Sequence, residues 1–523
     1  MKFITSLLAL VIISNTLFGQ VGALDTSFGD NGITITTFEN LSSGANSIAM
    51  QSNGKIILAG YNTEDANQDI FLVRYLPNGL LDTEFGKEGK YIFSISDSKD
   101  KCYDVETDDK DNIYLLGATR NIDIPGKGYV MKLTKNGKID SSFADDGIWV
   151  NDTEDIGDKF REIIILDNGK IIISGYTIFQ SITRSTTVQL NADGTIDNSF
   201  GTNGITNITV PSGYLGQFAS VDHEGNIITG GFQSYYTFNV VLIKLDSQGE
   251  PDLSFGDNGV LWDKSHSEDF VRSITIQSDN KIILGTTVTN VGTSTFGLIR
   301  YNEDGSFDDS FGDNGRVYTS FMDSYLDDEI AHSVLLDEEE NIIISGFVGL
   351  TDEINYAIAC FDNDGNLDTS FGDNGKVITD LGFDDMIYTS ILQEDGKLVC
   401  AGSSITSDDI SSFSMARYET KLSTSTVELN KINAEINLSP NPSDGRFIIS
   451  TDNIGSEITA VDLINLKGNV IHRLSQDEIN FLRSNKYLEI DLGENITRGL
   501  YAIRLFTHRG IISQALIVGR GSY

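Results

Sequence analysis

Acidic residues stand before several strand-like segments of the chain at a recurring position. They are Asp100, Asp158, Asp269, Asp328 and Asp385. If the strands that follow line a common channel, these carboxylates ring one of its mouths and could bind a divalent cation or a cationic ligand. Crowding of like charges would then raise the pKa of some of them. The other interpretation, which we favour, is that each carboxylate caps a turn and adds to solubility. We keep Asp158, Asp269, Asp328 and Asp385 as candidate metal ligands.

The histidines form no metal-binding or catalytic motif. They are His223, His266, His332, His472 and His508, and no two of them have the His-x-x-x-His spacing of a helical zinc site. The chain has neither the Gly-x-Ser-x-Gly elbow of hydrolases nor a phosphate-binding loop. A serine hydrolase is not thereby excluded, because a triad is recognised by its geometry. Paired glycosidase carboxylates cannot be chosen among 76 acidic residues. We therefore assign no catalytic and no cofactor-binding residue.

The composition narrows the class of partner. The chain has 523 residues with 76 acidic and 37 basic side chains, and its formal net charge is −39. From residue 434 onward nine basic and ten acidic residues nearly cancel, so the first 433 residues carry −38 of this charge. Such a surface repels phosphates, which argues against nucleic acid and anionic membranes as partners. With 39% apolar residues the chain is not disordered as a whole.

A phrase similar to Leu-Asp-Thr-Ser-Phe-Gly-Asp-Asn-Gly recurs seven times along the chain. The intervals between its phenylalanines are 57, 58, 57, 55, 56 and 60 residues, and these residues are Phe28, Phe85, Phe143, Phe200, Phe255, Phe311 and Phe371. An Asp precedes each Phe by three residues, and Gly residues stand six before and four after it. This regularity indicates repeats of one supersecondary unit. We interpret these anchors as structural: the Phe packs between adjacent sheets, and the Asp accepts backbone N–H groups in an Asx-type turn.

Each repeat unit holds four segments with strand character. In the first unit they are residues 46–51, 55–59 and 69–75, and residues 33–38 after the first anchor Phe are of the same kind. Asn-Gly and Asp-Gly pairs between such segments favour tight hairpins. Four antiparallel strands per unit are typical of a β-propeller blade, and each sheet must stack on its neighbours to bury its faces.

The order of the elements predicts how the ring closes. If residues 47–51 form an innermost strand, residues 33–38 form an outer strand that has no inner partners before it. Its partners would be residues 387–393, 397–401 and 412–418 at the far end of the repeats. The N-terminal strand then completes the last blade and leaves no exposed sheet edge at the seam. The sequence thus predicts an all-β fold, a seven-bladed β-propeller closed by its N-terminal strand. A ring open at the seam and two smaller propellers are the alternatives.

Two further chemical possibilities lie within the repeats. Residues 362–373 faintly resemble a calcium loop, but they lack the Glu at position twelve and have Gly at position four. We predict no cofactor, and a structural calcium in this loop is the alternative. The three cysteines, Cys102, Cys360 and Cys400, fall on expected strands and are interpreted as buried small apolar residues. Cys360 and Cys400 lie in successive blades, so a bridge between them is the other possibility.

These repeats resemble the delta-60 repeat of secreted bacterial proteins, which is similar in layout to other propeller repeats. The resemblance covers residues 24–418, with small departures such as Ala144 in place of the Gly that follows an anchor Phe. It implies the propeller architecture and does not specify an activity.

The N-terminus has the features of a secretory signal. Lys2 precedes an apolar run, residues 7–13, that polar and small residues follow. This run is shorter than the ~20 residues of a membrane-spanning helix; a buried N-terminal helix is the alternative. The sequence predicts four parts: a signal peptide (1–20), a propeller (21–421), a polar linker (422–435) and a C-terminal domain (436–523).

The C-terminal domain has alternating or apolar strands separated by turns with glycine, which predicts a small antiparallel β-sandwich. It is similar to the type A C-terminal sorting domain of the type IX secretion system of Bacteroidota. The residues that carry the similarity are Leu438, Pro440, Asn441, Pro442, Gly499 and Tyr501. The resemblance implies export across both membranes of a Gram-negative cell, contact with the type IX machinery, and release or attachment at the cell surface. An ordinary carbohydrate-binding-like sandwich is the alternative.

Two functions remain open at this point. The first, which we expect, is an exported binding or scaffold propeller without catalysis, whose ligand is an extracellular protein or glycan. The second is an extracellular hydrolase or lyase that acts on polysaccharide or peptide at the channel mouth. The second function requires a cluster of unlike polar residues that break the repeat at one face of the ring, and no such cluster is visible in the sequence. Convergence of such residues at one end of the channel would contradict a pure scaffold.

Overall fold

The computed structural model describes residues 21–420 and 435–518, except for short internal segments. These segments are residues 39–40, 63–67, 97–98, 122–123, 152–155, 181, 211–213, 235–237, 265–268, 291–292, 323–327, 351–352, 383, 406–409, 442, 444, 453–457, 466–469, 493–498 and 508–509. The chain forms two compact units, Met1–Ser423 and Thr424–Tyr523. The predicted signal peptide and residues 422–434 of the predicted linker lie outside the described residues.

In the described part of the first unit, 28 strands form seven four-stranded antiparallel sheets. Sheet 1 consists of β2 (Ser43–Met50), β3 (Ile56–Asn62), β4 (Ile70–Tyr75) and β5 (Lys90–Phe93); sheet 2 of β6 (Lys99–Thr107), β7 (Ile113–Asn121), β8 (Ile124–Leu133) and β9 (Ile148–Val150); sheet 3 of β10 (Ile156–Ile165), β11 (Ile171–Phe179), β12 (Ile182–Leu190) and β13 (Ile205–Thr209). Sheet 4 consists of β14 (Tyr214–Val221), β15 (Ile227–Ser234), β16 (Phe238–Leu245) and β17 (Val260–Asp263); sheet 5 of β18 (Asp269–Ile276), β19 (Ile282–Asn290), β20 (Thr293–Tyr301) and β21 (Arg316–Thr319). Sheet 6 consists of β22 (Asp328–Leu336), β23 (Ile342–Leu350), β24 (Glu353–Phe361) and β25 (Lys376–Thr379); sheet 7 of β26 (Asp385–Leu392), β27 (Leu398–Ile405), β28 (Ser411–Tyr418) and β1 (Ile33–Thr36).

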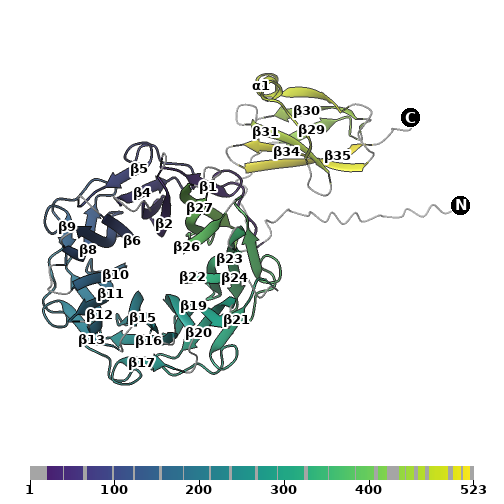
Figure 1. Cartoon of the computed structure of the whole chain (residues 1–523). Helices are drawn as coiled ribbons and strands as arrows, with labels where there is room; N and C mark the ends of the chain where they lie inside the picture. The colour runs from purple at the N-terminus through teal and green to yellow at the C-terminus, as the bar shows by residue number, and fades with distance from the viewer. Residues whose placement is uncertain are drawn as a thin grey trace. The chain divides into compact units, whose positions relative to one another are not determined.

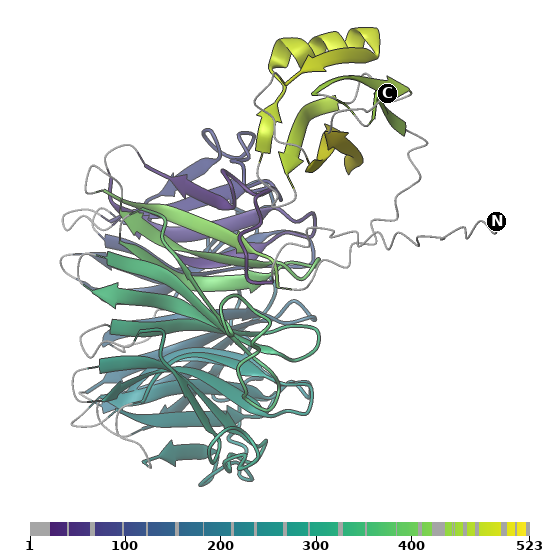
Figure 2. The same ribbon diagram turned by 90° about the vertical axis from the view of Figure 1, so that its right-hand side faces the viewer.

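The sheets stand around a central opening (Figure 1), and Figure 2 shows the same ring from the side. The first strands of the sheets, β2, β6, β10, β14, β18, β22 and β26, are the innermost. Each contacts the first strand of the next sheet, and β26 contacts β2. These contacts therefore run around the whole ring and place one strand of every sheet at the channel.

The N-terminal strand completes the sheet formed by the last three strands of the unit. β1 pairs antiparallel with β28, with Ile33 opposite Ala416. Upstream of β1, Leu24 forms a bridge with Tyr418. The two ends of the unit are thus held together by one strand pair, as the order of elements predicts.

The anchor residues of the repeat build the connection between consecutive sheets. All seven anchor phenylalanines are buried. In every unit the backbone N–H two residues after the anchor Asp donates a hydrogen bond to the Asp Oδ1. The Gly six residues before one anchor lies on the anchor ring of the preceding unit: a Cβ added at Gly79, which has φ of +79°, would lie 2.8 Å from the Phe28 ring. Gly is required at this position for both its backbone conformation and its close approach.

The core of the ring lies between neighbouring sheets. Leu58 of β3 packs with Val399 of sheet 7, whereas the adjacent Ile57 packs with Leu115 of sheet 2. Successive side chains of a strand point to opposite faces, so a middle strand that is buried on both faces needs the continuous apolar run seen in β3. Burying one such side chain contributes about 1.5–3 kcal/mol, and every sheet depends on both neighbours for this gain.

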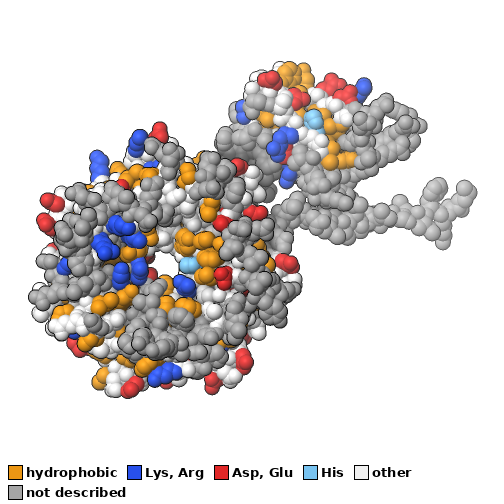
Figure 3. All heavy atoms as spheres, in the orientation of Figure 1, with side chains coloured by type: hydrophobic (Ala, Val, Ile, Leu, Met, Phe, Trp, Pro, Cys, Tyr) orange, Lys and Arg blue, Asp and Glu red, His pale blue; other side chains and the backbone are white. Residues whose placement is uncertain are grey.

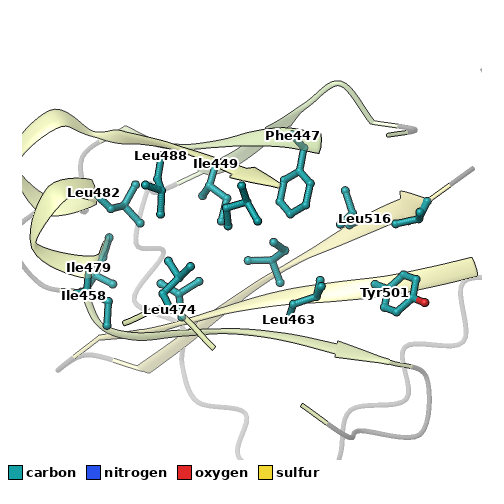
Figure 4. Close-up of a cluster of buried hydrophobic side chains, with 14 residues drawn as sticks. Phe447, Ile449, Ile458, Leu463, Leu474, Ile479, Leu482, Leu488, Tyr501 and Leu516 are labelled. Carbon is teal, nitrogen blue, oxygen red and sulfur yellow. The ribbon is translucent and has the colours of Figure 1, made fainter. Parts of the chain in front are cut away.

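The second unit has two sheets and one helix in its described part. One sheet consists of β29 (Glu435–Ser439), β30 (Arg446–Asp452) and β33 (Tyr487–Asp491), and the other of β32 (Val470–Arg473), β31 (Ile458–Asn465), β34 (Gly499–Thr507) and β35 (Gly510–Val518). Phe447 and Ile449 of the first sheet face Leu463 and Leu516 of the second across a buried cluster, which Leu482 of the helix completes (Figure 4). Among the described residues of the chain, no helix has the length and apolar character needed to cross a membrane.

The helix of the second unit, α1 (Gln476–Asn485), is absent from the sequence prediction. Ser475 caps its N-terminus in a capping box with Glu478, and Lys486 ends it in the left-handed conformation. This Ser-x-x-Glu pattern is a sequence signal for the N-terminus of a helix.

The residues of the expected sorting motif lie at the ends of strands in this unit. Leu438 pairs with Ile449 and packs against the buried cluster. The backbone N–H of Ile517 donates a hydrogen bond of 2.8 Å to Asn441 Oδ1. Gly499 begins β34 and Tyr501 is buried, whereas Pro442 lies outside the described residues. The motif therefore joins the first sheet to the last strand of the second.

Candidate functional site

Each innermost strand of the ring carries one extra residue at the same place in its pairing with the second strand. In β2, for example, Ala45 pairs with Gly60 and Ser47 pairs with Ala59, which leaves Asn46 as the extra residue of a β-bulge. The extra residues of the seven strands are Asn46, Tyr103, Arg161, Gln217, Arg272, His332 and Tyr388. A bulge re-aims a side chain and is over-represented next to functional sites. We call these seven positions the bulge ring.

The bulge ring differs from the rest of the repeat in its residue types. The anchors are the same residues in every unit, but the ring has amide, phenol, guanidinium and imidazole groups at equivalent positions. All of its side chains that the structure describes are partly exposed, although they lie on the innermost strands; the side chain of Gln217 is not described. Side chains at the channel, unlike the buried ones between sheets, are free to differ between units.

Cationic and aromatic side chains contact one another on sheets 1 to 3. The guanidinium carbon of Arg161 lies 3.8 Å from the centroid of the Tyr103 ring, and Tyr103 meets Tyr61 edge to face at 6.3 Å between centroids. On the other side, Lys101 Nζ lies 4.8 Å from the Tyr61 centroid. Such contacts are worth about 0.5–2 kcal/mol each and hold the cations in place.

Further cations adjoin this group. Burial lowers the pKa of Lys159, and the charges of Arg161, Lys101 and Arg120 lower it further. Lys159 pairs with Tyr176 across β10 and β11, so a third tyrosine joins the cluster. Figure 3 shows Lys and Arg side chains gathered on this face beside the central opening, over β6, β8 and β10. We call Lys101, Arg120, Lys159 and Arg161 the cationic patch.

A second group occupies the bulge ring on sheets 5 to 7. The His332 ring meets the Tyr388 ring edge to face at 5.3 Å and stacks on Phe347 at 5.6 Å between centroids. Burial lowers the pKa of His332 to about 3, and the charge of Arg272 contributes. Arg272 Nε is buried and has no hydrogen-bond partner among the described residues. The imidazole is therefore neutral at physiological pH, and the guanidinium beside it has a buried N–H without a described partner.

Carboxylates face the channel one or three residues beyond the bulge on sheets 2 and 3. Asp104 accepts hydrogen bonds from Ser47 Oγ (2.6 Å) and from the backbone N–H of Ile163 (2.8 Å), so it joins the inner strands of three sheets. Burial raises its pKa to about 6. Burial and the charge of Asp104 raise the pKa of Glu106 to about 8, and the pKa of Glu162 is also raised well above its usual value, again chiefly by burial. Burial favours the protonated form of all three groups, and Asp104 links the inner strands of sheets 1, 2 and 3.

The acidic residues that the sequence analysis selected are not part of the bulge ring, and the two with described contacts cap loops. Asp100 accepts hydrogen bonds from the backbone N–H groups of Ile95 and Ser96, and Asp385 accepts one from Leu381. Both carboxylates are buried caps of the loop that leads into their strand. Asp158 and Asp269 have side chains outside the described set.

Asp328 does not have the capping role that the sequence suggests. It is exposed, whereas the next residue, Glu329, is buried and accepts hydrogen bonds from Ser320 Oγ and from the backbone N–H groups of Phe321 and Met322. Glu329 therefore takes the capping position in sheet 6. Sequence counting missed it because the glutamate follows an equally acidic neighbour.

The structure also describes the calcium-like loop at residues 362–373 and the three cysteines. Asp362 accepts hydrogen bonds from the backbone N–H groups of Asp364 and Asn366 in a turn. Within the described ranges, no group of three or more His, Cys, Asp or Glu side chains is placed to hold a metal ion. Cys102, Cys360 and Cys400 are buried free thiols, so the structure has no Cys360–Cys400 bridge.

Sequence reasoning missed the bulge ring, where unlike side chains occupy one equivalent position of all seven sheets. The signal was present as one position per unit that varies among polar and aromatic residues inside an otherwise repeated strand. The position lies 17 or 18 residues after the anchor Phe in six units and 21 after it in the unit of Phe311, but its residue type changes from unit to unit, so it does not register as a repeated motif. The cationic patch was hidden by the net charge of −39, which averages over the whole chain.

Comparison with known proteins supports the two-part organisation. Residues 51–85, 166–200, 277–311 and 351–371 match a β-propeller domain of unknown function, DUF5122. Residues 437–519 match a secretion system C-terminal sorting domain. The predicted resemblance to a propeller repeat protein with a type IX sorting tail is confirmed by these matches, and the tail indicates export by the type IX system to the cell surface or medium. No curated protein matches the chain significantly.

Solved structures with many strands give distant likenesses. A protein of unknown function from Dyadobacter fermentans is 9% identical, covers 75% of this chain and 100% of its own, and has a TM-score of 0.38. A polysaccharide lyase, described as a PL25 ulvan lyase bound to -[GlcA(1-4)Rha3S]-, is 11% identical, covers 76% and 99%, and has a TM-score of 0.44. Drosophila Semaphorin 2a is 8% identical, covers 97% and 100%, and has a TM-score of 0.43. At such scores none of these likenesses bears on function.

Proposed function

We propose that this chain is an exported, non-catalytic binding protein whose ligand sits at the bulge ring. The observation that carries the proposal is the convergence of unlike side chains at one equivalent position of seven otherwise similar sheets. A pure scaffold has no need for Arg161, Arg272, His332 and Tyr388 at a position where Asn46 suffices. Recognition residues on a rigid repeated framework are the usual arrangement of a binding protein.

The finer architecture belongs to this proposal. We infer that the seven sheets are the seven blades of one closed propeller, spanning residues 21–421, and that β1 completes the last blade. The two sheets of the second unit form a β-sandwich, residues 436–523. Support for the closed ring comes from the contacts between β26 and β2 and from the pairing of β1 with β28.

The titration of the ring residues supports binding over catalysis. A general acid or base works best when its pKa lies near the operating pH. The pKa of His332 is about 3, and burial raises the pKa of the Tyr388 phenol above its usual value. Neither group exchanges a proton readily at neutral pH, whereas both can hydrogen-bond or pack against a ligand.

The route of export completes the proposed function. The sorting tail directs the chain through the type IX system, and we propose that residues 1–20 are a signal peptide removed in a Gram-negative cell. The propeller then acts on the cell surface or in the medium, where an extracellular glycan or protein is the partner.

A glycan array with the exported protein tests the proposal. Full-length wild type is compared with His332→Ala/Tyr388→Ala, with Arg272→Gln, and with a control, His223→Ala, whose side chain is exposed in a turn. We expect a ligand to bind wild type and the control and to bind both ring variants at least tenfold more weakly. Equal binding by all four proteins would contradict the proposal. Unfolding temperatures show whether the double variant is folded, and Arg272→Gln tests the site if it is not.

An extracellular lyase or hydrolase is the second candidate, and the contact of Arg272, His332 and Tyr388 favours it. A guanidinium could neutralise a uronate carboxylate while a neighbouring group takes a proton from the sugar. Release of unsaturated or reducing ends from acidic polysaccharides by wild type, and its loss in Tyr388→Phe, would establish this candidate in place of the binding function. Ligand binding without product would exclude it.

A further inference from the structure

We infer that the ligand of the ring is an acidic polysaccharide, bound through the cationic patch and the tyrosines that separate its members. This inference rests on the proposed function, and it names the class of ligand. The patch lies on the innermost strands β6 and β10 and on β7, and these three strands contact one another.

These four cations have no counter-charge among the described residues. Within that part of the chain, no ion pair or hydrogen bond joins Lys101, Arg120, Lys159 or Arg161 to a carboxylate. Several other cations of the ring are paired: Lys170 lies 2.6 Å from Asp197, and Arg300 lies 2.8 Å from Asp308. Four neighbouring cations repel one another, and an external anion would offset this repulsion.

The mutual repulsion of these cations affects the pKa of Lys159. The charges of Arg161, Lys101 and Arg120 add to burial in lowering the pKa of Lys159. Lys101, Lys159 and Arg161 are half-buried, and Arg120 is exposed. An anion that enters between them would therefore meet partly desolvated charges, where electrostatic attraction is stronger than in bulk water.

The tyrosines of the patch also suit a sugar chain. Tyr61 and Tyr103 lie between Lys101 and Arg161, at 4.8 Å and 3.8 Å from them respectively. Two adjacent flat rings with a cation at either side match a chain of sugar rings whose carboxylate or sulfate groups project at intervals. The Arg161 guanidinium has the planar fork of donors that suits such groups.

A nucleic acid also combines charge and flat rings. The net charge of −39 opposes both kinds of polyanion, so oligo(dT) serves below as the competing probe. We infer the acidic polysaccharide because the sorting tail indicates export to the cell surface or medium, where polysaccharides are the more abundant polyanions.

Affinity electrophoresis and calorimetry with defined polymers test this inference. The probes are polygalacturonate, dextran sulfate, neutral dextran and a single-stranded oligo(dT). Wild-type full chain is compared with Lys101→Gln/Arg161→Gln and with a control that loses the same charge, Lys87→Gln/Lys264→Gln, whose side chains are exposed on outer parts of sheets 1 and 4. Arg120→Gln alone serves as a second patch variant, because its exposed side chain is not needed for folding.

We expect wild type and the control to bind one or both acidic polysaccharides but not neutral dextran. The patch double variant should bind at least tenfold more weakly and Arg120→Gln several-fold more weakly, and added salt should weaken binding by wild type. The two acidic polymers distinguish carboxylate from sulfate recognition. Binding only to neutral dextran or to oligo(dT), or equal binding by wild type and the patch variants, would overturn the inference.

The outcomes also separate this inference from the proposed function. If the ring variants at Arg272 and at His332 and Tyr388 lose binding while the patch variants keep it, the ring binds a ligand of another class. If neither set of variants changes binding, the channel is not the site and both proposals fail.

Discussion

Arg417, near the end of the first unit, donates a hydrogen bond of 2.8 Å from Nε to the carboxylate of Asp25, which lies 392 residues earlier in the chain. Both side chains are buried, and Lys397 contacts the same Asp25 oxygen at 2.6 Å. The seam of the ring is therefore held by a buried ion pair as well as by the pairing of β1 with β28.

Removal of the Asp25 carboxylate should open this seam. Asp25→Ala leaves the buried Arg417 guanidinium without its partner, which costs about 3–5 kcal/mol in comparable cases. Asp252→Ala is the matched control: it removes the same residue of another repeat, whose contact to Lys244 is longer at 3.7 Å and more exposed. Urea unfolding should show the larger loss for Asp25→Ala; equal losses would mean that the seam is not special.

Acid should destabilise the ring through its paired carboxylates. A hydrogen bond from Lys170, with others from Ser199, lowers the pKa of Asp197 to about 2. For Asp308, burial alone would raise the pKa, but hydrogen bonds from Ser310 and the charge of Arg300 outweigh it and bring it to about 2. A carboxyl whose folded pKa is depressed stabilises above its unfolded value near 3.8 and loses this contribution as pH falls toward 2.

Unfolding free energies measured from pH 5 to pH 2 check this expectation. Asp197→Asn should lower stability at pH 5 by roughly 1 kcal/mol and should flatten the decline below pH 4. A variant that declines as steeply as wild type would show that Asp197 does not contribute to acid unfolding.

The close contact between Gly79 and the Phe28 ring should not tolerate one added methyl group. At Gly79 a Cβ would lie 2.8 Å from the Phe28 ring, whereas at Gly54, with φ of +76° and thus a similar backbone, the nearest atom is a Pro77 side-chain carbon at 3.4 Å. Gly54→Ala should cost about 1–2 kcal/mol for its left-handed backbone, and Gly79→Ala about 1–3 kcal/mol more. Thermal unfolding of both variants measures the difference, and similar losses would refute the role of the anchor contact.

Neutralisation of Glu106 should stabilise the ring in base. Burial and the neighbouring Asp104 raise the pKa of Glu106 to about 8. Because its folded pKa lies above the unfolded value of 4.5, the glutamate favours the folded state less as pH rises from about 4 to above 8. Glu106→Gln should therefore be more stable than wild type by about 1–3 kcal/mol at pH 9, since one pKa unit corresponds to about 1.4 kcal/mol.

The same substitution should be nearly neutral at pH 4, where the wild-type side chain is protonated in both states. Glu84→Gln, on an exposed glutamate, is the control and should show no such pH dependence. Stability of Glu106→Gln that parallels wild type from pH 4 to pH 9 would contradict the raised pKa.

Local chemistry explains why much of the ring is predictable. The Asp–Phe–Gly anchors form turns whose hydrogen bonds lie within a few residues, such as Gly32 N to Phe28 O at 2.7 Å. Their repetition therefore reports the architecture directly. The pairing of β1 with β28 follows from counting strands, because an outer strand without inner partners must find them at the other end.

The candidate site is less predictable because it depends on register. A shift of one residue at the entry to β22 decides whether Asp328 or Glu329 caps the loop. A β-bulge in each of β6 and β10 decides that Tyr103 and Arg161 face the channel. Neither leaves a local pattern in the sequence. The cationic patch draws its members from three strands, so no single segment of the chain appears basic.

Binding of the ligand at the bulge ring can be measured by hydrogen–deuterium exchange of the full chain with and without an acidic oligosaccharide at saturating concentration. We expect slower exchange in peptides that cover residues 99–107 and 156–165, the inner strands that carry Tyr103 and Arg161. Peptides of the hairpin turn at residues 51–55, beyond the other end of an inner strand, should be unchanged. Protection at that turn or in the second unit, with none on the inner strands, would show that the ligand binds elsewhere.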